Sequence, residues 1–354
     1  MGFWEPALWL PRDVSWNQIP PKFHDLIYPM YLAIPLVILR ILFEGLVGIP
    51  LAYFAGYYGK GASLPKQVGA YLSGGFLRNT KEKRVLECFW RFSYYFAAFM
   101  YGLIVLWDKS WLWDVKQCWI GYPFHPVPNS IWWYYTIEAA FYYSLLCSSF
   151  FEVRRKDFWE LIIHHFVTIG LLATSWTINF VRVGSLVLLS HDVSDWIMEL
   201  GKLVRYDHRW KSLTNFMFVM FLLSWIVSRL GYYPFVLIRS GIQDAAGLIQ
   251  PDYDLYDFSV VPYAPRMIIF LLATLLILHI FWTYVIVKVV IRTLSDGEAK
   301  DVRSDSDSEH EGDPVLKSDK KKLVKRKERS SNEDTDSDEA IKNDQTRRRK
   351  PRRE

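Results

Sequence analysis

Residues 157–195 read DFWELIIHHFVTIGLLATSWTINFVRVGSLVLLSHDVSD, and this stretch decides the fold. It contains two apolar runs, each close to the length of about 20 residues that a helix needs to cross a bilayer. Histidines and aspartates interrupt both runs. Because ionisable groups are costly at membrane depth, they mark functional positions by default. The stretch therefore predicts two adjacent transmembrane helices that share a polar site.

The same apolar signal recurs along the chain and predicts seven transmembrane spans. They cover residues 30–58, 88–107, 130–151, 158–178, 182–202, 213–237 and 265–291. Basic connections alternate with non-basic ones at every crossing, which places the N-terminus in the lumen and the C-terminus in the cytosol. Since lipid offers no hydrogen bonds to the backbone, we expect an all-α polytopic membrane protein. Its last six spans are predicted to enclose a substrate tunnel.

The two ends of the chain differ from this apolar body. The expected segments are a lumenal stretch (1–29), a first transmembrane helix (30–58), a basic cytosolic linker (59–81), a main helical domain (82–293) and a tail (294–354). Of the 60 residues 295–354, 34 are charged, so the tail is predicted to be disordered. Its basic runs suit membrane lipids, and we expect no nucleic-acid partner. We also predict phosphorylation in its acidic run, at Ser304, Ser306 and Ser308.

Helical spacing sorts the polar residues of the fourth and fifth spans onto faces. Residues three, four or seven apart share a face of a helix. One predicted face carries Asp157, Glu160, His164 and Thr168. The other carries His191, Asp195 and Lys202, flanked by Asp192 and Glu199. A short connection would hold both sets at one depth, so we predict a catalytic site made of His164, His165, His191, Asp192 and Asp195.

Histidines and carboxylates at a dry interface suit acyl transfer. A neutral imidazole can take a proton from an attacking amine, or it can itself attack a thioester. A nearby carboxylate can fix the tautomer of the imidazole and stabilise its cationic form. The sequence leaves direct attack and an acyl-imidazole intermediate as alternatives.

A metal site is the competing interpretation of the same residues. Three histidines and two aspartates could bind zinc or iron. Membrane di-iron enzymes, however, need many more clustered histidines, and this chain has eight in all. The three cysteines have neither zinc-ligand nor disulfide spacing. We therefore predict no metal and no bound cofactor.

Three further polar residues inside the spans are interpreted as structural. A lone histidine in a membrane is often a hydrogen-bond partner between helices, and we read His279 in this way. Arg40 and Glu44 lie four residues apart in the first span and are expected to pair.

The polar stretch resembles the signature of the ceramide synthases, the longevity-assurance family with a TLC domain. The likeness rests on residues 156–165, on 179–185 and on His191-Asp192-Val-Ser-Asp195, with support from 87–92 and 121–123. It extends from about residue 80 to residue 292. Only about 27 residues separate the first two spans, so the homeobox-like segment of many vertebrate members has no room here.

The resemblance implies an enzyme of the endoplasmic reticulum that transfers a fatty acyl group from acyl-CoA to the amine of a sphingoid base. It implies that catalysis needs His164, His165, Asp192 and Asp195. Three other residues of the signature are predicted to bind substrate: Asn179, Arg182 and Ser185. Homodimers or heterodimers are a further expectation from the family. So is an influence of the loop Arg239–Pro265 on the choice of acyl chain.

Two other classes of function remain as alternatives. One is a non-catalytic TLC protein, such as a lipid sensor or a translocon-associated factor, which should lack the histidine pair. The other is a metal-dependent enzyme that modifies lipids, such as a hydroxylase.

Overall fold

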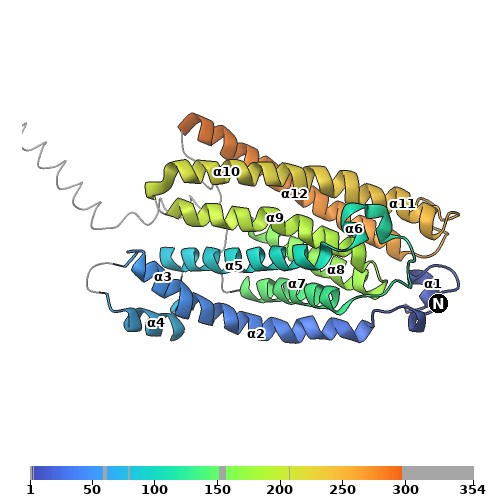
Figure 1. Ribbon diagram of the computed structural model, residues 1–354, viewed down its shortest axis with the longest axis horizontal. Helices are drawn as coiled ribbons and strands as arrows, with labels where there is room; N and C mark the ends of the chain where they lie inside the picture. Colours follow the sequence, from blue (N-terminus) through green and yellow to red (C-terminus); the bar gives the residue numbers. More distant parts are fainter. Residues whose placement is uncertain are drawn as a thin grey trace, which may run out of the picture. The chain divides into compact units, whose positions relative to one another are not determined.

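The computed structural model describes residues 2, 4–58, 62–78, 80–150, 157–206 and 208–296. Within these ranges the chain is helical, and its long helices run side by side (Figure 1). The predicted all-α fold class is confirmed. The predicted tail lies outside the described residues from position 297 onward, together with its three serines.

Seven long helical segments in the described ranges follow the predicted order. The first combines α2 (Ile27–Phe43), a π-helical turn (Glu44–Gly48) and α3 (Ile49–Phe54). The next four are α5 (Lys81–Leu106), α7 (Asn129–Ser148), α8 (Phe158–Thr177) and α9 (Val181–Tyr206). The sixth combines α10 (Lys211–Trp225), a π-helical segment (Ile226–Ile238) and α11 (Arg239–Ile249), and the last is α12 (Ala264–Asp296).

In the described part of the chain, five helical segments are long and apolar enough to cross a membrane. They are Phe23–Phe54, Lys81–Leu106, Phe158–Thr177, Lys211–Ile249 and Ala264–Leu294. The two remaining long helices, α7 and α9, are comparable in length but more polar, because α7 is rich in tyrosine and α9 carries charged side chains. The chain is thus a multi-pass membrane protein, and crossing by α7 and α9 stays a prediction.

Local sequence explains several features of these helices. The Thr80 side chain caps α5 by accepting a hydrogen bond from the Lys83 amide at 3.2 Å. Pro234 lies inside the second π-helical segment, and Pro50 lies two residues after the end of the first. Proline removes a backbone donor and crowds the carbonyl one turn earlier, which a wider turn accommodates.

The predicted loop before the last span is shorter than expected. The sixth helix does not end at residue 237 but continues through α11 to Ile249, so the connection is residues 250–263. The prediction was wrong because it followed the fall in hydropathy after Leu237. Polar residues such as Gln243 and Asp244 lower hydropathy without breaking a helix.

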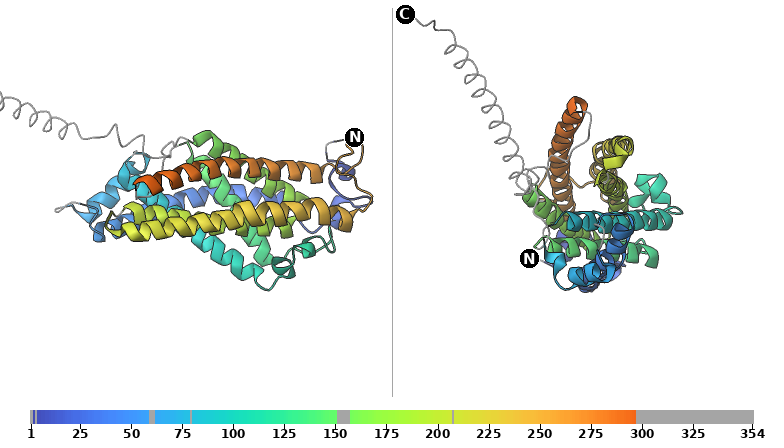
Figure 2. Two further views of the ribbon diagram at one scale, coloured as in Figure 1. Left: turned by 90° about the horizontal axis from the view of Figure 1, so that it is seen from above. Right: turned by 90° about the vertical axis from the view of Figure 1, so that its left-hand side faces the viewer.

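Six of the long helices close into a ring. Going around it, α5 packs on α9, α9 on the π-helical segment, that segment on α12, α12 on α8, α8 on α7, and α7 back on α5. The first helix, α2, lies against the outside of α7 (Figures 1 and 2). Such a ring is the predicted six-helix bundle, and the tunnel inside it stays a prediction.

The first helix is fastened to α5 by a group of buried charges. Arg40 donates to Glu44 at 2.9 Å, as the sequence predicted. Lys83 of α5 lies 3.1 Å from the same carboxylate, and the hydroxyl of Tyr71 on α4 (Leu64–Leu72) donates to it. The residues predicted as a linker therefore include a helix that joins this group.

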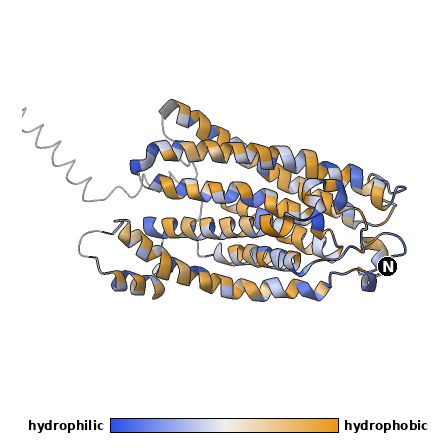
Figure 3. Cartoon of the chain, viewed as in Figure 1, coloured by the Kyte–Doolittle hydropathy of each residue, from blue (hydrophilic) through white to orange (hydrophobic). Residues whose placement is uncertain are grey.

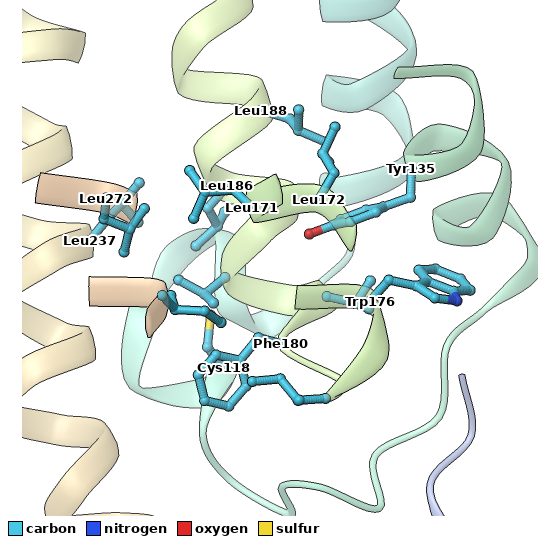
Figure 4. Close-up of a cluster of buried hydrophobic side chains, with 14 of the residues drawn as sticks. Cys118, Tyr135, Leu171, Leu172, Trp176, Phe180, Leu186, Leu188, Leu237 and Leu272 are labelled. Atoms are coloured by element: carbon cyan, nitrogen blue, oxygen red, sulfur yellow. The ribbon is translucent and has the colours of Figure 1, made fainter. Parts of the chain in front are cut away.

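Apolar side chains fill one end of the ring. Hydrophobic residues dominate the long helices (Figure 3). The largest buried cluster brings Leu171 of α8 beside Leu186 of α9, with Leu237 and Leu272 facing them from the sixth and last helices, and Trp176 of α8 beside Tyr135 of α7 (Figure 4). This end also holds α1 (Pro6–Trp9) and α6 (Ser110–Trp113). The packing fixes the register between α8 and α9, and with it the polar site farther along both helices.

Candidate active site

Polar side chains from five of the helical segments meet inside the ring. They come from α7, α8, α9, α12 and the π-helical segment Ile226–Ile238. The set is Glu138, His164, His165, His191, Asp192, Asp195, Arg229 and His279. All except His164 and Asp195 are buried. Burying so many polar groups is expensive unless they serve each other or a ligand.

Arg229 connects three of these segments. Its Nη2 lies 2.9 Å from both the carbonyl oxygen of His191 and Oδ1 of Asp195. Its Nε donates to Ser194 Oγ at 3.1 Å, and its Nη1 lies 3.2 Å from His279 Nε2. The guanidinium also stands over the ring of Trp225. Its fixed fork of donors therefore sets the position of α9 relative to α12.

The tautomer of His191 follows from its contacts. Its Nδ1 lies 2.7 Å from the carbonyl oxygen of Val187, and a carbonyl can only accept a hydrogen bond. In the neutral ring Nδ1 therefore carries the proton, and Nε2 carries a lone pair. Nε2 is buried and has no hydrogen-bond partner among the described residues. This arrangement leaves a base, or a nucleophile, ready at Nε2.

His279 is part of the site as well as a contact between helices. Since Arg229 can only donate, His279 Nε2 accepts, and the proton of the neutral ring lies on Nδ1. The ring centroid of His279 is 5.0 Å from that of His191. The sequence predicted that His279 is a hydrogen-bond partner between helices, and its bond to Arg229 is such a contact. The ring of His279, however, also lies next to that of His191.

The histidine pair on α8 lies on the other side of the site. The ring of Tyr142 on α7 is 6.1 Å from that of His164 and 6.2 Å from that of His165. His164 also meets Trp282 edge to face, at 5.4 Å. His164 is close enough for its charge to influence His191 and His279. The residues singled out in the fourth and fifth spans therefore lie near one another, and their common depth in a membrane stays a prediction.

The two aspartates of α9 have different surroundings. Asp195 is paired with Arg229, whereas the nearest hydrogen-bond donor to Asp192 is the hydroxyl of Tyr134, at 3.5 Å. Asp192 and Glu138 of α7 are close enough for their charges to interact. Ionised carboxylates so placed would repel each other, and a cation between them would remove the repulsion.

The two predicted helix faces are only partly realised. On α8, Asp157 accepts a hydrogen bond from Trp282 at 3.2 Å, about two helical turns before His164. On α9, Lys202 pairs with Glu199 at 2.7 Å, and Glu199 also lies 3.5 Å from Arg91 of α5. Lys202 therefore belongs to a separate ion-pair group, because the face of α9 at that level points toward α5.

The three predicted substrate-binding residues lie in the turn before α9 and in its first two turns, away from His164, His165 and His191. Asn179 donates to the carbonyl oxygens of Pro123 and His125 at 2.7 and 3.0 Å. Arg182 donates to that of Gln117 at 2.8 Å. Ser185 donates to the carbonyl of Arg182 at 2.6 Å and accepts a hydrogen bond from Trp111 Nε1 of the connection at 3.4 Å. The structure thus shows them holding the connection between α5 and α7, and a role in binding substrate stays a prediction.

Asn179 also makes the sharp turn between α8 and α9. Its φ is 62°, a left-handed conformation that asparagine tolerates better than most residues. The same side chain ties this turn to residues 123–125. The turn fixes how α9 returns beside α8, and it therefore positions both halves of the site.

The connection between α5 and α7 holds two titratable groups outside the spans. Burial raises the pKa of the Cys118 thiol to about 12, with opposing effects from Arg182 and Asp114. Burial, reinforced by the nearby Arg182, lowers the pKa of His125 to about 4. Cys118 is therefore no candidate nucleophile, and His125 stays neutral at physiological pH.

Sequence reasoning missed Arg229 and Glu138. Both are ionisable and both lie within predicted spans, so the rule that singled out the histidines applied to them too. They stand alone in otherwise apolar or aromatic runs, without the motif that marked residues 157–195. Within the described residues, no three or more histidine, cysteine or acidic side chains are arranged to hold a metal ion.

Several known proteins have sequences similar to this chain. A family model described as the TLC domain matches residues 84–288. Ceramide synthase hyl-1 of Caenorhabditis elegans is 59% identical over 308 residues, covering 86% of this chain and 84% of that protein. Ceramide synthase hyl-2 of the same organism is 40% identical over 321 residues, covering 87% and 95%. Human ceramide synthase 5 is 33% identical over 358 residues, covering 88% of each. The chain, with its TLC domain and its buried histidine and aspartate site, belongs to the ceramide synthase family.

Proposed function

We propose that this chain transfers a fatty acyl group from acyl-CoA to the amine of a sphingoid base, and that the buried histidine and aspartate site performs the transfer. The relatives named as ceramide synthases support the reaction. The observation that carries the site is His191 Nε2, a buried imidazole nitrogen with a lone pair and no partner among the described residues.

The roles follow from the surroundings of each group. His191 Nε2 takes the proton that the amine loses as it attacks the thioester carbon. Arg229, itself paired with Asp195, holds the backbone of α9 at His191, and the two aspartates of α9 stabilise the imidazolium that forms. The CoA thiolate leaves and takes up that proton, so the products are an amide and a free thiol.

An acyl-imidazole route uses the same atoms in two steps. His191 Nε2 or a histidine of α8 attacks the thioester, and the amine then attacks the acyl-imidazole. His164 Nδ1 is also buried without a hydrogen-bond partner in the described part of the chain, which leaves a second imidazole available. Rapid mixing with acyl-CoA alone separates the two routes, because only the second releases CoA in a burst before any sphingoid base is added.

The protein is proposed to lie in the endoplasmic-reticulum membrane with its N-terminus in the lumen and its tail in the cytosol. The alternation of basic connections supports this orientation. In the structure α1, α6 and the end of α11 gather at one end of the bundle, and α4 lies at the other (Figure 1). Protease protection of epitope tags at the two termini in sealed microsomes tests the orientation.

The testing experiment is acyl transfer in membranes from cells that lack endogenous ceramide synthase. Sphinganine and a panel of acyl-CoAs are supplied to wild type, His191→Gln, Asp195→Asn and the exposed control His24→Gln. We expect an N-acyl product from wild type and the control, and little from the two site variants. No product from wild type with any acyl-CoA would favour a non-catalytic TLC protein. Full activity of the site variants would keep the reaction and overturn the site.

A further inference from the structure

Glu138 is a buried acid that the proposed mechanism does not use. The residue is 1% exposed, and neither carboxylate oxygen has a hydrogen-bond partner in the described part of the chain. A carboxylate so placed is costly because it loses the hydrogen bonds of water and gains none from the protein. Such a group is retained where a ligand supplies the missing partner.

The face of α7 that carries Glu138 points into the active site. Tyr134 lies one turn before Glu138 and its hydroxyl approaches Asp192 at 3.5 Å. Tyr142 lies one turn after it and its ring meets both His164 and His165. Residues at i, i+4 and i+8 share a face of a helix, so Glu138 lies between the aspartate half and the histidine half of the site.

The charges around Glu138 are unbalanced. Three carboxylates gather here, those of Glu138, Asp192 and Asp195. Of the three, Asp195 forms an ion pair, with Arg229. Glu138 and Asp192 have no ion-pair partner in the described ranges. Two buried carboxylates without a cation repel each other, and one positive charge between them would remove most of that cost.

We propose that Glu138 and Asp192 bind the ammonium group of the sphingoid base, and that Glu138 accepts the proton which converts this ammonium into the attacking amine. The inference rests on the proposed function. Of the two substrates, the sphingoid base is the cationic one, whereas the CoA portion of the other carries negative phosphates. The carboxylate pair therefore fits the former and would repel the latter.

The proton transfer makes the amine a nucleophile. A primary alkyl ammonium, like that of lysine, has a pKa of about 10 and is protonated at neutral pH. Its nitrogen has no lone pair until one proton moves to the Glu138 carboxylate. The free lone pair then forms the C–N bond, the C–S bond or acyl-imidazole bond breaks, and His191 takes the second proton. Two protons leave the nitrogen in all, one to each group.

The test compares purified full-length wild type with Glu138→Gln and Glu138→Asp. Glu82→Gln, an exposed residue in the first turn of α5, is the matched control. The KM for sphinganine, the KM for acyl-CoA and kcat are measured between pH 6.5 and 9. We expect Glu138→Gln to lower kcat/KM for sphinganine by about 10²-fold at pH 7, the usual scale for losing a proton acceptor, with little change in the KM for acyl-CoA. Glu138→Asp should recover part of the activity.

The pH profile separates proton acceptance from a structural role. Free amine increases tenfold with each pH unit, so the deficit of Glu138→Gln should narrow as the pH rises. The titratable groups that face Glu138 are the same in both proteins: Tyr94 of α5, Tyr134 and Tyr142 of α7, and Asp192 and Asp195 of α9. A deficit that stays constant with pH would overturn the proton transfer.

A binding measurement on wild type keeps the inference testable even if both variants misfold. Sphinganine and an analogue with a hydroxyl in place of its amine are compared by thermal shift without acyl-CoA. We expect sphinganine to raise the melting temperature. The apparent Kd of the analogue should be at least tenfold higher than that of sphinganine. Equal binding, or an active Glu138→Gln with wild-type constants, would overturn the inference and leave the proposed function intact. An inactive wild type would instead remove the proposed function itself.

Discussion

Arg229 Nη2 lies 2.9 Å from Asp195 Oδ1, and the pair is nearly closed off from the surroundings, with side chains 4% and 17% exposed. The same nitrogen reaches the backbone carbonyl of His191. One guanidinium therefore neutralises a carboxylate and fixes the part of α9 that carries the proposed base. Arg229, which lies outside the histidine and aspartate motif, thus holds the motif residues of α9 in place.

Replacing Arg229 should damage both stability and activity. Removing one partner from a buried ion pair leaves an uncompensated charge and costs about 3–5 kcal/mol. We expect Arg229→Gln to lower the melting temperature and abolish acyl transfer. Arg229→Lys should also fail, since an ammonium cannot reproduce the four hydrogen bonds of the fork. Thermal melts and sphinganine acylation measure both effects.

The control for this experiment is Arg239→Gln. Arg239 is exposed and bonds Gln243 at the start of α11, and it should behave as wild type. Wild-type activity in Arg229→Lys would mean that the position needs only a positive charge.

His191→Gln should separate chemistry from binding. Glutamine keeps a hydrogen bond to the Val187 carbonyl but offers no basic nitrogen in place of Nε2. Loss of a general base costs about 10²–10⁴-fold, so kcat should fall by this factor while both KM values change little. Steady-state kinetics on purified protein give the answer. Unequal changes in the two KM values would instead indicate a binding role for this ring.

Gly184→Ala should destabilise the bundle. A Cβ on Gly184 of α9 would overlap the hydroxyl of Tyr135 on α7, which bonds Ser175 at 2.8 Å. Overpacking of this kind costs about 1–3 kcal/mol. The matched control is Gly241→Ala, where nothing lies within 4 Å of the added carbon. A melting temperature for Gly184→Ala equal to that of the control would show that α7 and α9 can separate without cost.

Arg266→Gln should alter the selection of acyl chains if the last connection guides it. Arg266 donates to five carbonyls of this connection, among them those of Leu255 at 2.9 Å and Val260 at 2.7 Å. Loss of these bonds should loosen residues 250–263, and we expect a broader range of acyl-CoAs to be used. The readout is product distribution over an acyl-CoA panel, with the exposed Arg292→Gln on the same helix as control. An unchanged distribution would place selection elsewhere.

The connection between α5 and α7 should loosen in acid. His125 has a pKa lowered to about 4 by burial, so it is neutral when packed and protonated more readily when released. The contribution of neutral, buried His125 to the stability of the closed connection is complete above pH 6.5. It is lost as the pH falls toward 4, because the opened state then binds more protons than the closed state. The loss should amount to roughly 1–3 kcal/mol.

Hydrogen exchange measures this opening. Amides of residues 114–125, corrected for intrinsic rates, should exchange faster at pH 5 than at pH 7.5. His125→Phe should remove the pH dependence, because phenylalanine cannot be protonated. The same dependence in His125→Phe would assign it to another group.

The sequence determined the helices and half of the active site. Spans are local features: a run of about 20 apolar residues reads as a helix whatever surrounds it. The spacing of His164 with His165 and of His191 with Asp195 is also local, and their shared depth follows from the short turn at Asn179. The end of the sixth helix at Ile249 escaped prediction, since hydropathy records lipid exposure rather than helix termination.

The tertiary structure alone decided which side chains meet at the histidines. In a soluble helix the apolar stripe marks the buried face, but in lipid the outside of a helix is as apolar as the inside. Hydropathy therefore could not show that Glu138 and Arg229 face inward, nor that Asn179 and Arg182 hold the connection between α5 and α7. Those contacts depend on how six helices close into a ring, and this closure is set by packing such as that of Gly184 against Tyr135.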